Sequence, residues 1–383
     1  MKVLFVTSWY PTNENPGFGV FIKEHAKAIH SVQIEIVVLA VLVERSTSIF
    51  QVEVRDFNDE SGIRTIQINI SSRYRDLVYH FIPLLRFISY KYYNKLISST
   101  FNPDIVHSNV VFPAGMIGDY ISKRIHKPHI ITEHWSKVAG ILKKPYLSGL
   151  TKKSYKRAVR ILPVSEFLKT NLTGLMPFLK SDRFRVVANV INSEPFTYKK
   201  KKKNTDEIKF CAVATWATKK IPDKIPELFI EALAQIQQKT DKKVTLTMIG
   251  GGNRWVELKQ LCEKKSYTTV LTGYLSKEKI AKILQESDFF VHASNIETFG
   301  VVIVEALMTG TPVICSNVGA LPELINEFNG VLCENTVENW VEGIEKAISL
   351  SFRNEEIAEN VKNEFSTLII GEKIEAIYKE VLK

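Results

Sequence analysis

Two glutamates stand out because they flank the expected start of a helix. Glu297 follows an apolar segment at 289–293, and Glu305 lies eight residues later inside an apolar run. The first N–H groups of a helix lack intrahelical acceptors and carry partial positive charge, so the backbone at 299–302 is suited to a phosphate. Carboxylates accept hydrogen bonds from sugar hydroxyls. The spacing therefore predicts an anion site flanked by two sugar-binding carboxylates, the alternative being a loop charge and an exposed helix residue.

The same stretch resembles the signature of the family-4 retaining glycosyltransferases, Glu-x7-Glu followed by Gly-x-Pro-Val. It is present as Glu297 to Glu305 and then Gly310–Val313. The resemblance implies that Glu297 is catalytic and lies at the donor sugar, and that Glu305 binds the nucleotide ribose. The main-chain groups implied as ligands of the donor diphosphate are those of Phe299, Gly300 and Val301.

Glycines at two further places also match the family. Gly17 and Gly19 lie between the first strand and the first helix, where a close backbone could present N–H groups to phosphate or acceptor, although a plain turn is the alternative. This is not a dinucleotide fingerprint, because Ile22 stands where its third glycine belongs. Gly251, within 250–252, matches the glycine-rich turn of the family's second domain, which implies a contact with the donor.

Two histidines end expected strands at places where the family carries histidine. The resemblance makes His134, in Thr132-Glu133-His134, a second catalytic residue near the anomeric centre of the donor. His107 is the weaker candidate. For both, the alternative is a buried histidine whose hydrogen bonds are satisfied within the core.

One departure from the family concerns the diphosphate. The usual Val-Gly-Arg-x4-Lys-Gly has Thr215 at the arginine, whereas Lys220 keeps the lysine spacing, with Lys219 beside it. Lysine neutralises phosphate but cannot reproduce the bidentate fork of arginine. The resemblance therefore implies Lys220 as a diphosphate ligand, assisted by Lys219 or by Arg254; a weakened donor site is the alternative.

The elements that must position these residues are short apolar strands alternating with amphipathic helices. Near-continuous apolar strands separated by helices favour parallel sheets covered on both faces. Strands are expected at 3–7, 34–42, 105–107, 129–132, 161–164, 185–188, 208–214, 244–249, 268–271, 289–293, 312–315 and 331–333. Helices are expected at 20–30, 114–125, 146–158, 226–237, 255–264, 277–285, 301–308 and 337–350.

Because the pattern occurs twice, we expect two Rossmann-like doubly wound α/β domains facing a central cleft, the arrangement called GT-B in the family. The first domain, at 1–198, would bind the acceptor, and the second, at 207–365, the nucleotide sugar. A Lys-rich linker at 199–206 separates them. The C-terminal helix at 366–383 could cross back to the first domain.

Charge is distributed unevenly along the 383 residues. Residues 1–198 carry +11, the run 199–203 carries +5, and residues 204–383 carry −6, giving the net +10. A basic first domain favours an anionic acceptor or an anionic membrane surface, unless the asymmetry is simple drift. The aromatic and basic segment 79–97 suits such an interface, with a core helix as the alternative. Nucleic acid is disfavoured, because no recognisable nucleic-acid module is present.

The four cysteines and the apolar content predict the compartment. The cysteines are widely spaced without a Cys-x-x-Cys pair, which disfavours a zinc site or a disulfide framework. Neither a secretory signal nor a membrane-spanning run is expected. These features favour the cytoplasm, with peripheral attachment to the inner face of the membrane as an option.

The resemblance implies a retaining, metal-independent, hexosyltransferase-like enzyme that needs no cofactor. It would move a sugar from a UDP- or GDP-sugar to a glycan or lipid-linked acceptor, in cell-surface polysaccharide or glycolipid assembly. The absence of Asp-x-Asp from the sequence fits metal independence. A GT-B epimerase or phosphorylase, and a donor-binding protein without transferase activity, are the alternatives.

Overall fold

The computed structural model describes residues 1–12, 14–15, 17–201, 206–217 and 223–383, and it divides into two compact units. Unit 1 comprises Met1–Val190 together with Thr367–Lys383, and unit 2 comprises Ile191–Ser366. The C-terminal helix is therefore part of unit 1. The boundary lies ahead of the expected Lys-rich linker, of which residues 202–205 are outside the described residues.

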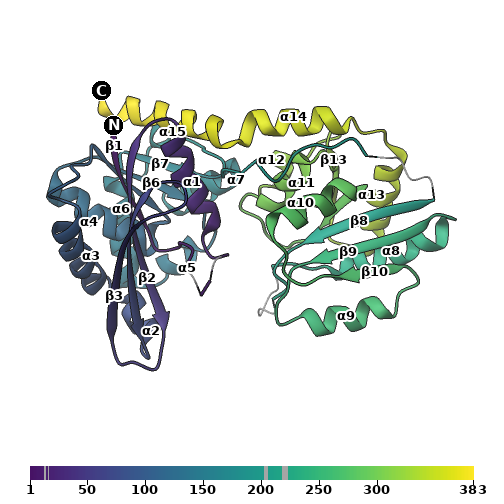
Figure 1. Ribbon diagram of the computed structural model, residues 1–383, viewed down its shortest axis with the longest axis horizontal. Helices are drawn as coiled ribbons and strands as arrows, with labels where there is room; N and C mark the ends of the chain where they lie inside the picture. Colours follow the sequence, from purple (N-terminus) through teal and green to yellow (C-terminus); the bar gives the residue numbers. More distant parts are fainter. Residues whose placement is uncertain (13, 16, 202–205, 218–222) are drawn as a thin grey trace. The chain divides into compact units, whose positions relative to one another are not determined.

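Unit 1 is built on a seven-stranded sheet of order β3-β4-β2-β1-β5-β6-β7 (Figure 1). Every neighbouring pair is parallel except β3 and β4, which form an antiparallel hairpin. The strands are β1 (Lys2–Thr7), β2 (Glu35–Arg45), β3 (Gln51–Asn58), β4 (Arg64–Ser72), β5 (Ile105–Asn109), β6 (His129–Glu133) and β7 (Arg160–Pro163).

The β3–β4 hairpin is absent from the sequence expectation, and the strand expected at 185–188 does not form. β3 reads as polar because its side chains are mostly exposed at the edge of the sheet, where charges discourage pairing with other chains. The chain after Phe184 instead runs beside β7 with two hydrogen bonds, Arg185 N to Ile161 O and Val187 N to Pro163 O, both at 3.1 Å.

Helices surround this sheet, and the last one comes from the far end of the chain. α15 (Thr367–Leu382) packs on α1 (Val20–Ser31), and Gly371 allows the two backbones to approach, since a Cβ there would lie 2.3 Å from Ala28 O. The other helical segments are α2 (Arg75–His80), α3 (Ile82–Leu96), η1 (Val111–Gly115), α4 (Met116–Ile125), α5 (Val138–Leu142), α6 (Pro145–Arg157), α7 (Glu166–Leu175) and η2 (Ser181–Arg183).

Unit 2 is built on a six-stranded, all-parallel sheet of order β10-β9-β8-β11-β12-β13 (Figure 1). Its strands are β8 (Glu207–Val213), β9 (Lys243–Ile249), β10 (Thr268–Leu271), β11 (Phe289–His292), β12 (Val313–Ser316) and β13 (Gly330–Cys333). Its helices are α8 (Glu227–Lys239), α9 (Trp255–Glu263), α10 (Lys277–Glu286), α11 (Val301–Met308), α12 (Leu321–Leu324), α13 (Val337–Ser349) and α14 (Asn354–Phe365). The expected strands and helices of this half are confirmed, and two parallel-sheet α/β domains are present.

Each sheet has a point where its connectivity changes direction, between β1 and β5 in unit 1 and between β8 and β11 in unit 2. Loops leaving the carboxyl ends of these neighbouring strands diverge to opposite faces and leave a crevice that ligands commonly occupy. The loops after β8 and β11 carry Lys224 and Glu297. The loops after β1 and β6 carry the Gly17–Gly19 segment and His134.

Candidate donor site and the histidine cluster

The carboxylate of Glu297 lies at the carboxyl end of β11 and is already engaged by two donors. His292 Nε2 lies 2.8 Å from its Oε1, and Lys224 Nζ pairs with the same oxygen. The Glu297 side chain retains 15% exposure. A carboxylate that is accessible and flanked by a cation can exchange these partners for the hydroxyls of a sugar.

The backbone of Glu297 is held in place by the loop after β12. Ala320 N donates to Glu297 O at 3.0 Å. Gly319, with φ of +59°, packs so closely that a Cβ would lie 2.1 Å from the same oxygen. Only glycine fits there, because both the left-handed backbone and the space exclude a side chain. The position of Glu297 is thus determined by a loop that comes later in the sequence, after α11 and β12.

Lys224 is absent from the sequence-based predictions, which placed the phosphate-binding lysine at Lys220. Residues 223–225 run along the loop after β11: Ile225 N donates to Ala293 O at 3.1 Å, and Asn295 N donates to Asp223 O at 2.8 Å. This pairing brings Lys224 to Glu297. Lys224 lies three residues before the first residue of α8, so its distance from the start of that apolar helical pattern is a signal in the sequence that could have found it. Lys219 and Lys220 lie outside the described residues, and Thr215 is exposed.

The loop and helix after Glu297 form as the sequence predicts. Gly300 is the N-cap of α11 with φ of +101°, Phe299 is buried beneath it, and Val301 is the first helical residue. Glu305 is 7% exposed, with Lys277 Nζ at 3.9 Å. Glu297, the N-terminus of α11 and Glu305 therefore belong to one strand–loop–helix segment.

The glycine-rich turn after β9 brings its backbone against the loop after β8. A Cβ on Gly250 would lie 1.9 Å from Ala214 O, and Trp216 N donates to Gly251 O at 2.8 Å. The Arg254 guanidinium is paired with Glu257 and Glu227, and these carboxylates raise its pKa. A donor contact by Arg254 thus requires exchange of these partners, and its role stays a prediction.

Gly17 and Gly19 of unit 1 differ in whether the fold requires glycine at their position. Gly19 caps α1 with φ of +72°, and a Cβ there would lie 2.5 Å from Trp9 O, so a tight packing contact requires glycine. Gly17 is exposed and has no atom within 4 Å of such a Cβ. Packing therefore explains Gly19 and leaves Gly17 without a structural requirement.

His134 lies in a closed cluster of polar side chains at the carboxyl end of β6. Its Nδ1 is 2.9 Å from Asn189 Oδ1, and its Nε2 faces the Asn109 amide at 3.1 Å. Burial is the larger cause that holds the pKa of His134 well below its usual value, and the charge of His25 is the next. A neutral ring has one N–H, so if Nδ1 donates to Asn189 the Asn109 amide must turn its NH2 group towards Nε2. The contact of His134 with a donor stays a prediction.

His107 is a buried core residue within unit 1. Its Nδ1 hydrogen-bonds Tyr378 of α15, and its Nε2 lies 2.7 Å from Thr132 Oγ1. Both ring nitrogens therefore have partners inside the unit. His107 therefore fits the interpretation as a buried histidine whose hydrogen bonds are satisfied within the core. Its hydrogen bond to Tyr378 of α15 could not be anticipated from local sequence.

Glu133 is a second polar residue that the sequence-based predictions did not include. Its buried carboxylate accepts from the N–H groups of Val111, His134 and Trp135 at 2.9 to 3.1 Å and from Tyr155 Oη at 2.7 Å. Burial raises its pKa to about 6 despite these donors. This carboxylate joins three segments around His134.

Across the described parts of the chain, no group of histidine, cysteine, aspartate and glutamate side chains is arranged to hold a metal ion. Among the same residues, no helix combines the length and apolar character that crossing a bilayer requires.

Comparison with known proteins assigns both halves. The family model described as glycosyl transferases group 1 matches residues 194–364, and that described as glycosyltransferase family 4 matches 17–195. An uncharacterised glycosyltransferase of Methanocaldococcus jannaschii is 27% identical over 342 residues, 84% of this chain and 90% of that protein. A component of the phosphatidylinositol N-acetylglucosaminyltransferase of Homo sapiens is 25% identical over 364 residues, 89% of this chain and 71% of that protein.

Among solved structures, that of HepE from Anabaena in complex with UDP superposes with a TM-score of 0.72. It covers 99% of this chain and 100% of that one at 16% sequence identity. This likeness concerns the fold.

Proposed function

Because the chain belongs to the family-4 glycosyltransferases of the GT-B fold, we propose that it moves a sugar from a nucleotide diphosphate sugar to an acceptor hydroxyl with retention of configuration. The observation that carries the proposal is the meeting of Lys224 and Glu297 at the segment leading into α11. One cation, one carboxylate and a helix N-terminus provide complementary groups for a diphosphate and for sugar hydroxyls.

In the proposed reaction the bond between the anomeric carbon and the phosphate oxygen breaks, and the acceptor oxygen bonds to that carbon from the same face. The departing phosphate oxygen takes the acceptor proton. Lys224 and the first N–H groups of α11 stabilise the negative charge that develops on the phosphate. Glu297 holds sugar hydroxyls and favours the positive charge near the anomeric carbon. Because Lys224 and the helix supply the positive charge, we expect no metal, and a chelator should leave the rate unchanged.

The donor we propose is a UDP- or GDP-sugar, used as a substrate with no further cofactor. The structural neighbour with bound UDP supports a uridine nucleotide, and the human relative belongs by name to an N-acetylglucosaminyltransferase. Assembly of a cell-surface polysaccharide or glycolipid in the cytoplasm is the setting we propose. An epimerase or phosphorylase would give product without a hydroxyl acceptor.

Attachment to an anionic membrane is the second part of the proposal, and it is supported by α2 and α3. Leu77 of α2 and Phe87 of α3 are exposed, as are Tyr74 and Phe81 beside these helices, in a half of the chain that carries excess positive charge. Apolar side chains among cations suit the headgroup region of anionic lipid. The protein should co-sediment with anionic liposomes at low salt and be released by high salt, and Phe87→Ser should weaken retention. Failure to bind such liposomes would remove this part alone.

The first experiment is a thermal-shift panel with UDP, GDP, ADP and their common sugars, using wild type and Glu297→Ala. Binding to the folded state raises the melting temperature, so one nucleotide should give a clear shift with both proteins. Glu297→Ala should lower transfer on the order of a hundredfold or more, as loss of a transition-state contact does. If no nucleotide shifts the wild type, the donor-binding role is wrong. Anomeric configuration of the product, read by NMR, tests retention.

A further inference from the structure

We propose that His292 is a positioning residue, which holds the Glu297 carboxylate at the donor sugar while Lys224 turns to the donor diphosphate. This rests on the proposed function, because it assigns to Glu297 a contact with the sugar. His292 is the last residue of β11 and does not belong to the glutamate motif from which the donor site was predicted.

Two donors, one from His292 and one from Lys224, meet at a single carboxylate oxygen of Glu297. His292 Nε2 lies 2.8 Å from Glu297 Oε1 and 3.1 Å from Lys224 Nζ. The imidazole is 3% exposed and stacks on Phe290, with ring centroids 6.1 Å apart and planes inclined by 17°. Burial and the charge of Lys224 hold the pKa of His292 well below its usual value, so the ring is neutral.

The geometry decides which ring nitrogen carries the proton. A neutral imidazole has one N–H. If that proton were on Nδ1, Nε2 and the Glu297 oxygen would be two acceptors 2.8 Å apart, which is repulsive. With the proton on Nε2, His292 and Lys224 both donate to Glu297, and the contact between Lys224 and His292 is one between two donors sharing an acceptor. The Nε2–H tautomer is therefore the one assigned.

The two donors differ in how firmly they are held. The imidazole of His292 is fixed by strand register, with Cys315 opposite in β12, and by its packing on Phe290. Lys224 carries its charge on a flexible four-carbon stem. A diphosphate at the start of α11 would compete with Glu297 for that charge. When Lys224 turns to the phosphate, His292 still donates to Glu297, so the carboxylate keeps its direction and one partner.

The test compares three substitutions of His292. His292→Gln places an N–H near the position of Nε2, whereas His292→Asn is too short to reach Glu297 and His292→Leu has no donor. We measure calorimetric Kd values for the nucleotide and the nucleotide sugar chosen by the thermal-shift panel, together with kcat. The Leu and Asn variants should bind nucleotide within about threefold of wild type. The ratio of the Kd for the nucleotide sugar to the Kd for the nucleotide should rise on the order of ten- to a hundredfold. The kcat should fall by a similar factor.

Rescue separates positioning from a merely structural role. His292→Gln should restore most of both losses. His129→Leu is the matched control, because His129 is also buried and its Nε2 also makes a 2.8 Å hydrogen bond, in this case with Ser108. It should leave the ratio of the two Kd values unchanged.

Two outcomes would overturn the role of His292. One is a Leu or Asn variant with the wild-type ratio and rate, and the other is a Gln variant as impaired as Asn. If the Leu variant does not fold, the Asn and Gln pair still decides. Wild-type protein that binds no nucleotide would overturn the proposed function itself, which is a different result.

Discussion

At the residue scale, the position of Lys224 shows how one ammonium group can serve two partners. It pairs with Glu297, and the same charge is suited to a diphosphate at the neighbouring helix N-terminus. The strand–loop pairing at 223–225 and 293–295 sets this position. The usual arginine of the family is replaced by Thr215, so we expect Lys224 to carry a large share of diphosphate binding.

Lys224→Ala should therefore weaken binding of the nucleoside diphosphate by about 1.5–3 kcal/mol, the range for hydrogen bonds to charged groups. Binding of the corresponding nucleoside should change little, because it has no phosphate. Isothermal titration calorimetry with both ligands measures the difference. Lys239→Ala is the control, since Lys239 lies on the exposed part of α8 and pairs with Glu345. Equal loss for nucleoside and diphosphate would show that Lys224 acts on folding instead.

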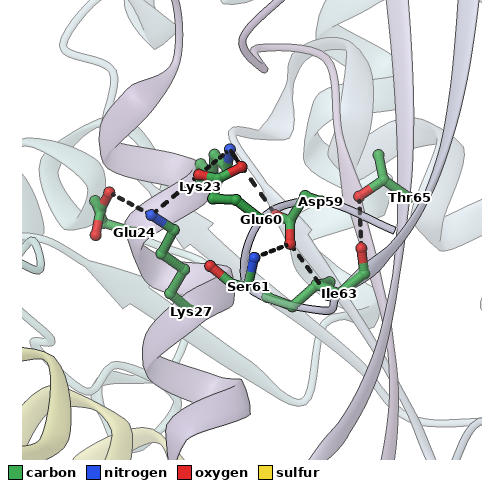
Figure 2. Close-up of polar contacts among 8 residues, drawn as sticks. All are labelled: Lys23, Glu24, Lys27, Asp59, Glu60, Ser61, Ile63 and Thr65. Atoms are coloured by element: carbon green, nitrogen blue, oxygen red, sulfur yellow. Dashed lines mark hydrogen bonds and ion pairs between the residues drawn. The ribbon is translucent and has the colours of Figure 1, made fainter. Parts of the chain in front are cut away.

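At the scale of elements, the β3–β4 hairpin is tethered to α1 by the polar contacts of its turn (Figure 2). Asp59 Oδ1 accepts from Ser61 N at 2.9 Å and Ile63 N at 3.0 Å, which closes the turn. Glu60, 64% exposed, reaches Lys23 of α1, and that hydrogen bond lowers the Glu60 pKa to about 2. Asp59 thus orders the turn. Glu60 attaches it to α1 through Lys23 and Lys27, with Asp59 Oδ2 also 3.9 Å from Lys23 Nζ.

The two acids should differ in their effect on stability. Asp59→Ala leaves two backbone N–H groups without their acceptor, which we expect to lower the free energy of unfolding by about 1–3 kcal/mol. Glu60→Ala removes the ion pairs of an exposed carboxylate with Lys23 and Lys27, which solvent screens, and should cost less than about 1 kcal/mol. Urea denaturation of both variants provides the comparison. A larger loss for Glu60→Ala would mean that the ion pair, and not the turn, holds the hairpin.

At the scale of the whole molecule, buried histidines are concentrated in unit 1. Burial lowers the pKa of His25 to about 4 and that of His129 to about 3, and it holds the pKa values of His107 and His134 well below the usual range. Within the described residues of unit 2, His292 is the one buried histidine. The units therefore differ in how acid affects them.

Unit 1 should lose stability as the pH falls from 6.5 towards 4. The unfolded chain takes up protons on these histidines in that range, whereas the folded unit does not, so the stabilisation present above pH 6.5 is lost on acidification. His25 and His129 each account for on the order of 3 kcal/mol. The raised pKa of Glu133 acts in the opposite direction. Its contribution to stability is fully present below the pKa that Glu133 has in the unfolded chain, and it is lost as the pH rises through about 6. At about 2 kcal/mol it is the smaller effect.

Calorimetric melting at a series of pH values between 4 and 8 tests this expectation. The transition of unit 1 should fall in temperature faster than that of unit 2. His129→Leu, which removes one group that takes up protons on unfolding, should flatten the dependence. Equal stability at pH 5 and pH 7 would contradict the neutral assignment of the histidines.

Local sequence determined much of this protein. Apolar runs such as 289–293 predict strands because a strand buried on both faces needs no polar residues, and β11 and β12 of unit 2 are buried at every position. Glu297, Gly300 and Glu305 are close in sequence and lie on one strand–loop–helix segment, so their spacing alone indicates a site. The family signature depends on the same segment.

The tertiary structure decided what depends on pairing between distant segments. The edge strand β3 shows only a short alternation, Val52 and Val54, before its polar residues, and it forms because β4 provides its partner. Lys224 reaches Glu297, 73 residues away, only because β8 and β11 are neighbours in the sheet. The bond between His107 and Tyr378 joins residues 271 positions apart. Hydrogen bonding and charge act over a few ångströms in space, so local patterns predict elements, and only the assembled fold determines which side chains meet.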